Sequence, residues 1–353
     1  VPYRPLGSLA KRIFILRILI SALSLSVITI VTNRLSNVTT AVIKKEPLDR
    51  PEEVGEVEWV NDEAWFRDQV KKGCCPFAKT LYEHRYAGIE YRCCTSMIEQ
   101  GKIDPLRAIG GVDYSQFLHK NKNVTIFIQG DSVAEQHFLG MICYAWSVHD
   151  LNIDLHRLGA RVGGGEISGN GWRATITLNK KNGNDLFFTI EHLRWDKPHV
   201  APKKHYSLFD VPDFIIVGGW HHGDTDTVTI KRLLHQMRTE GIHGHERQSV
   251  IVVNALPSHF PGGDYLQSGN YKHDGCAQNN SMGDPNINEN LVSIVKNQTN
   301  ITLLEISQLY HHRGNAHIGS PLHGRPDCLH WCIAPGVMDA LTRMTLAAIY
   351  NNS

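Results

Sequence analysis

The chain has 353 residues, of which 42% are hydrophobic and 20% are charged. That length suits one large globular domain or two small ones, and the composition is ordinary for a protein with a hydrophobic core. The formal net charge of +1 excludes a strongly basic or acidic chain, so we expect no nucleic-acid partner and no strongly acidic one.

The N-terminal region predicts a membrane anchor. Residues 13–32 are apolar or small apart from Arg17, which is close to the length that crosses a bilayer. The basic residues before this stretch predict a cytosolic tail at 1–12 and a lumenal position for the rest of the chain; they are Arg4, Lys11 and Arg12. The alternative is a cleaved signal peptide with its apolar region at 18–31, which would make the protein secreted. Because no clear cleavage site follows, we favour the retained anchor.

Two further features predict the secretory pathway. Six Asn-x-Ser/Thr sequons begin at Asn37, Asn123, Asn279, Asn297, Asn300 and Asn351. The eight cysteines are an even number, and disulfides are the default in an oxidising compartment. Residues 33–60 carry mixed charge and two prolines, so we expect a stem there and the lumenal domain at 61–353.

Strand-like and helix-like segments alternate from residue 124 onward. The predicted strands are 124–129, 172–178, 186–192, 213–217, 249–255 and 301–306, with a hairpin at 179–184. The predicted helices are 132–146, 228–238, 286–296 and 337–350. This alternation predicts an α/β fold with a mostly parallel sheet, whose ligand lies at the carboxyl ends of the strands.

The motif Gly130-Asp131-Ser132 lies at one such strand end. Glycine permits a tight turn, and Ser132 then begins the next helix, where unpaired N–H groups can stabilise an oxyanion. A serine at this place can also be a simple N-cap.

The segment Asp327-Cys328-Leu329-His330-Trp331-Cys332 supplies an acid and a base. A turn can direct residues three apart toward one point. His330 would take the proton of Ser132, and Asp327 would orient the imidazole and stabilise its charged form. The alternative is a surface acid and a core histidine beside a disulfide.

Three segments resemble the PC-esterase family, especially the plant trichome birefringence-like proteins. The last segment matches the family pattern D-C-x-H-W-C-L-P-G, and the G-D-S block is followed by Cys143 at the family's spacing. The stretch Pro257-Ser258-His259-Phe260-Pro261-Gly262-Gly263-Asp264 is similar to the family's S-P-x-H-F-x-G-G-[DE]-W segment. Together the matches span residue 74 to the C-terminus.

The resemblance implies an SGNH-like three-layer sandwich in a single-pass type II Golgi membrane protein. It implies transfer of acetyl groups onto polysaccharide hydroxyls, with Ser132, His330 and Asp327 as the triad. Ser132 would accept the acyl group, and a sugar hydroxyl activated by His330 would attack the acyl-enzyme. The partners would be a polysaccharide or oligosaccharide acceptor and an acyl donor such as an acetyl ester, with no other cofactor.

Two departures from the family concern the oxyanion. The family commonly has a basic residue and an asparagine where this chain has Glu135 and Gln136. When His221 is aligned with the histidine of the family's N-T-G-H-W-W segment, Gly218 replaces the asparagine. The candidate oxyanion donors are therefore the backbone N–H groups of Ser132 and of Gly218 or Gly219, or the side chain of Gln136.

Other histidines offer further candidates. His221 and His222 follow a predicted strand, and they either line the active-site cleft or have no role in it. His259 is expected to be structural or substrate-facing rather than a second base, and His317 resembles a family histidine. No HExxH motif and no cysteine pair at zinc-ribbon spacing occurs, so we expect no metal site.

For the disulfides we hypothesise a Cys276–Cys332 bridge. Cys143 and Cys328 would each pair with a cysteine of the 74–94 cluster, and the two remaining cluster cysteines would pair with each other. Such bridges would fix the loop that carries the acid and the base.

Three functions remain open. The first is an O-acyltransferase that acts on a glycan, and the second is a carbohydrate esterase with the same triad and water as acceptor. The third is a catalytically inactive glycan-binding protein, which the substitutions at Glu135 and Gly218 support and the intact triad residues oppose. We favour the first.

Overall fold

The computed structural model describes most of the chain after residue 102 and shorter parts before it. The described residues are 40–41, 56–72, 75–77, 103–158, 171–178, 185–194, 209–220, 227–239, 248–260, 276–277, 285–296, 298, 301–318, 321–322, 325–333 and 336–353. The chain divides into two units, Val1–Thr39 and Thr40–Ser353. All of the structural description below concerns the second unit.

A seven-stranded sheet forms the centre of this unit, with the strand order β10-β9-β8-β4-β7-β6-β5. The run from β10 to β7 is parallel, and β6 and β5 are antiparallel to their neighbours. The strands are β4 (Thr125–Gly130), β5 (Asn152–Leu158), β6 (Gly171–Leu178), β7 (Leu186–Arg194), β8 (Phe214–Gly218), β9 (Ser249–Val253) and β10 (Ile301–Leu304). The predicted α/β fold with a mostly parallel sheet is therefore confirmed.

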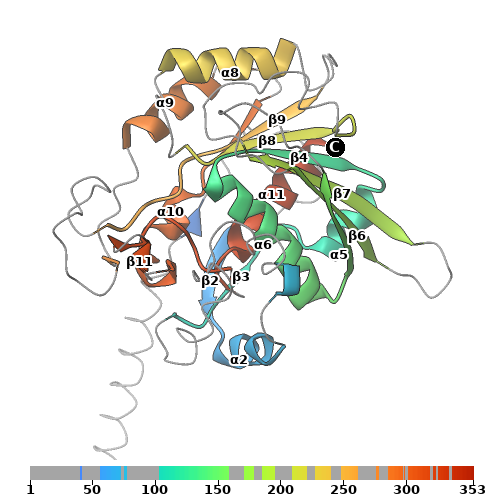
Figure 1. The fold of residues 1–353 in the computed structure, drawn as a ribbon, viewed down its shortest axis with the longest axis vertical. Coiled ribbons are helices and arrows are strands. Elements are labelled where there is room, and N and C mark those ends of the chain that lie inside the picture. The colour runs from blue at the N-terminus through green and yellow to red at the C-terminus, as the bar shows by residue number, and fades with distance from the viewer. Residues whose placement is uncertain are drawn as a thin grey trace, which may run out of the picture. The chain divides into compact units, whose positions relative to one another are not determined.

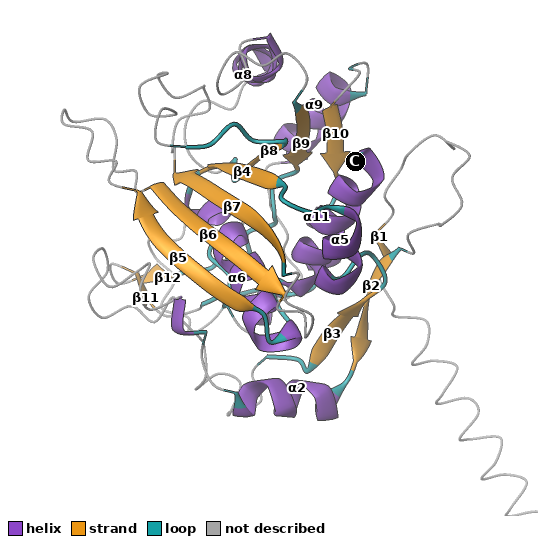
Figure 2. Cartoon of the chain, turned by 90° about the vertical axis from the view of Figure 1, so that its right-hand side faces the viewer, coloured by secondary structure: helices purple, strands orange, loops and turns teal. Residues whose placement is uncertain are grey.

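Helices cover both faces of the sheet (Figures 1 and 2). Alternate residues of a strand face opposite sides, and β4 follows this rule. Ile126 and Ile128 pack in the core with α6 (Ser132–His149) and α11 (Asp339–Asn352). Phe127 packs on the other side, with α8 (Thr227–Thr239) and α9 (Pro285–Val295). A parallel strand buried on both faces needs a continuous apolar run, which is why 126–128 carries no polar residue.

Helix α6 is buried along most of its length, between the sheet and α11. Asp131 caps its first turn by accepting a hydrogen bond from the backbone N–H of Val133. The helix ends at Asp150, which has left-handed backbone dihedrals (φ 50°). Because both of its sides are covered, its sequence is apolar around the helix rather than along one stripe.

A smaller three-stranded sheet, β1-β2-β3, contains residues from the predicted stem. Its strands are β1 (Thr40–Ala41), β2 (Val57–Asn61) and β3 (Leu106–Ile109). Helix α2 (Glu63–Lys71) contacts β3, and α5 (Tyr114–Lys120) follows β3 in the chain. Trp59 of β2 is buried, and its indole N–H donates to the carbonyl of Leu309. The folded unit therefore includes residues before 61, where the sequence placed its start.

Every strand and helix predicted from residue 124 onward is present, with ends shifted by a few residues. Strand β5 was not predicted, because it is an edge strand with exposed polar residues between its apolar ones. In the part of the chain that the structure describes, every helix is too short or too polar to span a bilayer. The anchor predicted at 13–32 and the hairpin loop at 179–184 lie outside that part and stay predictions.

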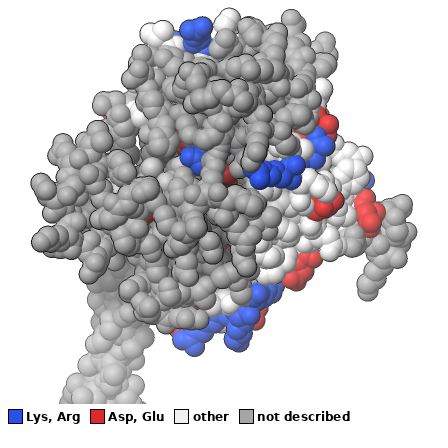
Figure 3. All heavy atoms as spheres, viewed as in Figure 1, with Lys and Arg blue, Asp and Glu red and all other residues white. Residues whose placement is uncertain are grey.

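On the face shown in Figure 3, the lysine and arginine side chains of the described residues lie among acidic ones and do not form one basic surface. This mixed surface agrees with the formal net charge of +1.

Candidate active site

The turn from β4 into α6 positions Ser132. Strand β4 ends at Gly130, Asp131 caps the helix, and Ser132 is the first helical residue. A Cβ atom at Gly130 would collide with the carbonyl oxygen of Gly218 on the neighbouring strand. A glycine is therefore required for this strand to end beside β8 and for the chain to turn directly into the helix.

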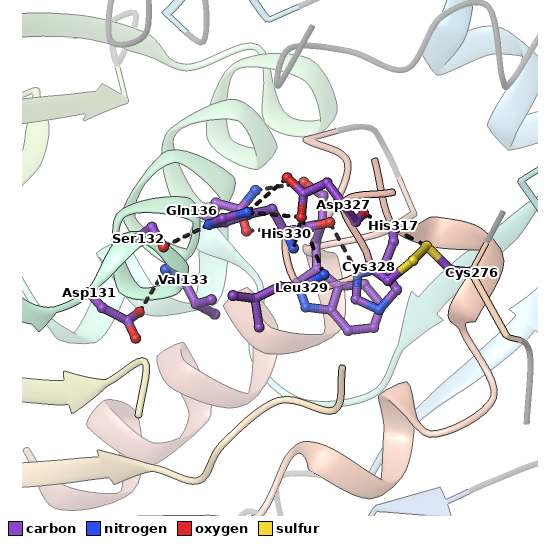
Figure 4. Close-up of polar contacts among 11 residues, drawn as sticks. Asp131, Ser132, Val133, Gln136, Cys276, His317, Asp327, Cys328, Leu329 and His330 are labelled. Carbon is purple, nitrogen blue, oxygen red and sulfur yellow. Dashed lines mark hydrogen bonds and ion pairs between the residues drawn. A yellow bond between two sulfur atoms is a disulfide. The ribbon is translucent and has the colours of Figure 1, made fainter. Parts of the chain in front are cut away.

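Ser132, His330 and Asp327 form one chain of hydrogen bonds (Figure 4). Nε2 of His330 lies 2.7 Å from Oγ of Ser132, and Nδ1 lies 2.9 Å from Oδ2 and 3.0 Å from Oδ1 of Asp327. The carboxylate can only accept, so Nδ1 carries a proton and a neutral imidazole leaves Nε2 free to accept the serine proton. This is the arrangement that activates a serine as a nucleophile.

Asp327 also holds the loop that carries the base. Its Oδ1 accepts hydrogen bonds from the backbone N–H groups of Leu329 (3.3 Å) and His330 (3.0 Å). An aspartate that bonds the backbone two and three residues ahead closes a tight turn. The same carboxylate therefore shapes the loop and orients the imidazole, which explains the i, i+3 spacing of acid and base.

Gln136 links the nucleophile helix to that loop. Its Oε1 accepts from the backbone N–H of Trp331 at 3.0 Å, and its Nε2 donates to the Trp331 carbonyl at 2.8 Å. Gln136 is fully buried, one turn along α6 from Ser132. The sequence proposed Gln136 as an oxyanion donor; the structure instead engages its amide in positioning the backbone next to His330.

The structure describes two disulfides, one on α6 and one in the loop that carries the acid and the base. Cys75 pairs with Cys143 of α6, which confirms the predicted pairing of Cys143 with the N-terminal cluster. Cys276 pairs with Cys328 inside the acid–base loop, so the hypothesised Cys276–Cys332 bridge and the pairing of Cys328 with the cluster are wrong. Cys332 is also disulfide-bonded. The correction follows from the turn at Asp327, which places Cys328 within 5.4 Å of Cys276 between their Cα atoms.

A buried ion pair lies beside the first turn of α6. Nη1 of Arg194, at the end of β7, lies 3.1 Å from Oε2 of Glu135, and both side chains are buried. Arg194 stands opposite Gly130 in the parallel pairing of β7 with β4. Glu135 follows Ser132 by three residues and therefore projects from the same side of the helix. Glu135 therefore holds the guanidinium group of Arg194, which comes from strand β7, close to the first turn of α6.

The end of β8 approaches the same helix terminus. Gly218 is paired with Gly130, and Gly219 has a positive φ of 74°. A Cβ atom at Gly219 would collide with the carboxylate of Asp131 and would lie 3.0 Å from the backbone nitrogen of Ala134. The backbone at 219 is therefore close enough to the start of α6 that only a glycine fits there.

The remaining histidine candidates separate into two groups. His221 and His222 lie outside the described residues. His259 is fully buried, with its ring nitrogens bonded to His317 and to the carbonyl of His311. These contacts favour the structural role for His259 over the substrate-facing one. Within the described ranges, no group of three or more His, Cys, Asp or Glu residues could hold a metal ion.

Sequence reasoning missed three features of this site, which are the Gln136 link, Arg194, and the contact between His259 and His317. Arg194 follows a predicted strand, and Ser132 follows another. Because the carboxyl ends of parallel strands meet at one side of a sheet, the position of Arg194 could have identified it as a neighbour of the site. The other two contacts join residues that are 195 and 58 positions apart, and no sequence pattern identifies them.

Part of this chain is similar in sequence to a known protein family. Residues 224–348 match a family model described as PC-Esterase, a GDSL/SGNH-like acyl-esterase family found in Pmr5 and Cas1p. That range contains Asp327 and His330, and Ser132 precedes it. The match confirms the resemblance to the PC-esterase family and indicates an esterase or acyltransferase.

A curated relative extends the likeness beyond that range. Protein trichome birefringence-like 14 from Arabidopsis thaliana is 25% identical to this chain over 299 residues. The aligned part covers 67% of this chain and 72% of the relative. The resemblance to the trichome birefringence-like proteins is therefore confirmed.

Proposed function

We propose that this protein is an SGNH-like O-acyltransferase that moves an acyl group, most simply acetyl, onto a polysaccharide hydroxyl. The observation that carries the proposal is the continuous chain from Asp327 through His330 to the hydroxyl of Ser132. The PC-esterase match supports acyl chemistry, and the trichome birefringence-like relative supports the family assignment.

In the first step, Nε2 of His330 takes the Ser132 proton while Oγ attacks the acyl carbonyl carbon. The protonated His330 then gives this proton to the departing alcohol of the acyl donor, which leaves an ester on Ser132. Asp327 holds the imidazole in the tautomer that accepts at Nε2.

In the second step, a sugar hydroxyl gives its proton to His330 and attacks the ester carbonyl of the acyl-enzyme. Ser132 recovers the proton as its bond to the acyl group breaks, and the acylated sugar leaves. If water takes the place of the sugar, the same site hydrolyses the ester. The difference between transferase and esterase therefore depends on how well the bound acceptor excludes water.

The oxyanion of each tetrahedral intermediate needs N–H donors near the start of α6. The N–H of Val133 is already bonded to Asp131. We assign the role to the backbone N–H groups of Ser132 and Gly219, because the Gly219 backbone packs against this helix terminus. The ion pair of Arg194 with Glu135 also places a buried guanidinium group beside the first turn of α6.

A Golgi location and a type II membrane topology complete the proposal. The apolar stretch at 13–32 and its basic flank support the anchor, with the catalytic unit in the lumen. The two disulfides support an oxidising compartment.

The test uses the full chain and its Ser132→Ala variant with a chromogenic acetyl ester, with and without oligosaccharide acceptors. We expect acetylated oligosaccharide from the parent and a loss of about 10⁴-fold or more in kcat for Ser132→Ala. Release of acetate alone would establish a carbohydrate esterase instead. Equal turnover by both proteins would contradict the site, and no turnover by either would favour the inactive glycan-binding alternative.

A further inference from the structure

Two buried histidines outside the triad face one another behind the acid–base loop. His259 follows β9, and His317 follows the short 3₁₀ helix η2 (Gly314–Ala316). Their exposed fractions are 0% and 1%, and Nδ1 of His259 lies 2.7 Å from Nε2 of His317. A nitrogen–nitrogen distance this short is that of a strong hydrogen bond.

The outer nitrogen of each ring bonds a backbone carbonyl. Nε2 of His259 lies 2.8 Å from the carbonyl oxygen of His311, and Nδ1 of His317 lies 3.1 Å from that of His330. A carbonyl oxygen only accepts, so both outer nitrogens must carry a proton. A neutral imidazole has one N–H, so two neutral rings would leave two lone pairs facing each other at the central contact.

Three hydrogen bonds in a row therefore need three N–H protons, and two neutral imidazoles supply only two. We propose that His259 and His317 share an additional proton at their central contact, and that this singly charged pair positions the backbone of the catalytic base His330. The distance of 2.7 Å leaves no room for a metal ion between the rings. Two zinc–nitrogen bonds of about 2.0–2.1 Å would separate the nitrogens by more than about 3 Å.

The ring of Trp331 stabilises a charge on this pair. Its centroid lies 3.9 Å from that of His317, with 34° between the planes, and 5.9 Å from that of His259. An aromatic face attracts a cation, and more strongly where water is excluded. Gln136 fixes the backbone of Trp331 from α6, so the pair is connected to the nucleophile helix as well as to the loop.

Other groups around the pair oppose its charge. Burial is the largest cause that lowers the pKa of His259, and the neighbouring His311 and His312 lower it further. On the acid–base loop, the side chain of His330 bonds Asp327 and Ser132. These groups oppose a second positive charge on the pair.

This balance gives the pair a direction of pH dependence. All three hydrogen bonds are present at a pH below the pKa of the pair, and one of them is lost as the pH rises through it. In the neutral pair, Nε2 of His317 donates to Nδ1 of His259, so Nδ1 of His317 carries no proton and its bond to the His330 carbonyl is lost. The N–H of Ile318, at 3.0 Å, still donates to that oxygen. The loop that carries the base is then less firmly held, and activity falls on the alkaline side.

The shared proton can be observed without any assay of activity. In the full chain labelled with ¹⁵N-histidine, we expect one strongly deshielded ring proton that couples to nitrogens of two different histidines. It should disappear in both His259→Gln and His317→Asn and persist in His156→Gln, a control at an exposed histidine on β5. Absence of such a proton from the parent, or two protons that each couple to one ring only, would overturn the proposal.

The effect on catalysis rests on the proposed function and has its own readout. His317→Asn keeps a neutral donor near the His330 carbonyl and removes the titration, whereas His317→Leu removes both. For ester hydrolysis we expect the Leu variant to lose about 10- to 100-fold in kcat/KM at every pH. The Asn variant should lose less and should lack the parent's alkaline decline.

An alkaline decline identical in the parent and in His317→Asn would overturn the positioning role. If no ester were turned over by any of these proteins, the proposed function would fail, and the ¹⁵N spectra alone would decide whether the proton is shared. The two failures are therefore distinguishable.

Discussion

Ser132 is positioned mainly by its own neighbours in sequence, whereas the loop that carries Asp327 and His330 also depends on residues far away in the chain. The serine takes its place from the end of β4, the N-cap Asp131 and the first turn of α6, which are consecutive. The acid and the base lie on a loop that is fixed by a disulfide, by Gln136 and by buried histidines.

This difference means that a mutation can displace the acid and the base without displacing the nucleophile, or the reverse. We call the β4–α6 turn with Ser132 and the loop with Asp327 and His330 the two halves of the site. A change in a distant contact can displace His330 while α6 keeps Ser132 in place, because the helix is buried between the sheet and α11. A change at the β4–α6 turn acts on the nucleophile alone. The predictions below are ordered from the largest expected effect to the smallest.

Asp327→Asn should have the largest effect. The amide oxygen can still accept from the backbone N–H of His330, so the loop keeps its shape. The side-chain NH₂ group stabilises the wrong imidazole tautomer, and we expect kcat to fall about 10⁴-fold with little change in thermal stability. The measurement is the rate of ester hydrolysis beside a thermal melt. A loss below tenfold would show that Asp327 does not orient the base.

Removing the Cys276–Cys328 disulfide tests the distant support of the loop. The bridge closes a segment with a sequence separation of 52, and its loss through Cys276→Ala with Cys328→Ala should lower the free energy of unfolding by about 4 kcal/mol. The matched control removes the Cys75–Cys143 bridge, whose separation of 68 predicts a similar loss of about 4 kcal/mol.

The two disulfide variants should differ in activity at a temperature where both are folded. We expect kcat/KM to fall in the first, where the bridge lies in the acid–base loop, and to stay near the parental value in the second. Equal activities would contradict the assignment of the loop as the more dependent half of the site.

Gln136→Leu should remove the hydrogen bonds that join α6 to the loop of the acid and the base. It leaves a buried N–H and a buried carbonyl of Trp331 without this partner, at a cost of about 1–3 kcal/mol each. We expect lower kcat/KM together with lower stability. The matched variant Gln136→Glu keeps the acceptor for the Trp331 N–H and should recover part of both losses. A Glu variant no better than Leu would argue against the role of this contact.

Asp131→Ala should have the smallest effect on stability, about 1 kcal/mol from the lost N-cap of α6. The control is Asp113→Ala, which removes the N-cap of α5. That helix makes none of the hydrogen bonds described for Ser132. We expect similar losses of stability from chemical denaturation and a lower kcat only for Asp131→Ala. Equal kcat values would show that the cap does not position the nucleophile.

The β4–α6 half of this comparison could be predicted from the sequence. A continuous apolar run before Gly130 predicted the buried strand, and the helix was expected to begin at Ser132, where it does begin. Local rules for strands, glycine and helix caps are sufficient there, because each acts over a few residues.

The loop half could be predicted only in part. The spacing of Asp327 and His330 indicated an acid–base turn, and the structure brings both to Ser132. The partner of Cys328 was wrong, because disulfide connectivity depends on how distant segments pack and not on their spacing. The role of Gln136 was missed for the same reason, since its partner lies 195 residues away.

The formation of an ester on Ser132 tests the central claim most directly. The full chain is mixed with an activated acetyl ester, quenched in acid and digested for peptide mass spectrometry. We predict that the peptide containing Ser132 gains one acetyl group, and that this gain is absent from Ser132→Ala. Turnover without an acetylated Ser132, or an acetyl group on another residue whose replacement abolishes turnover, would contradict the account.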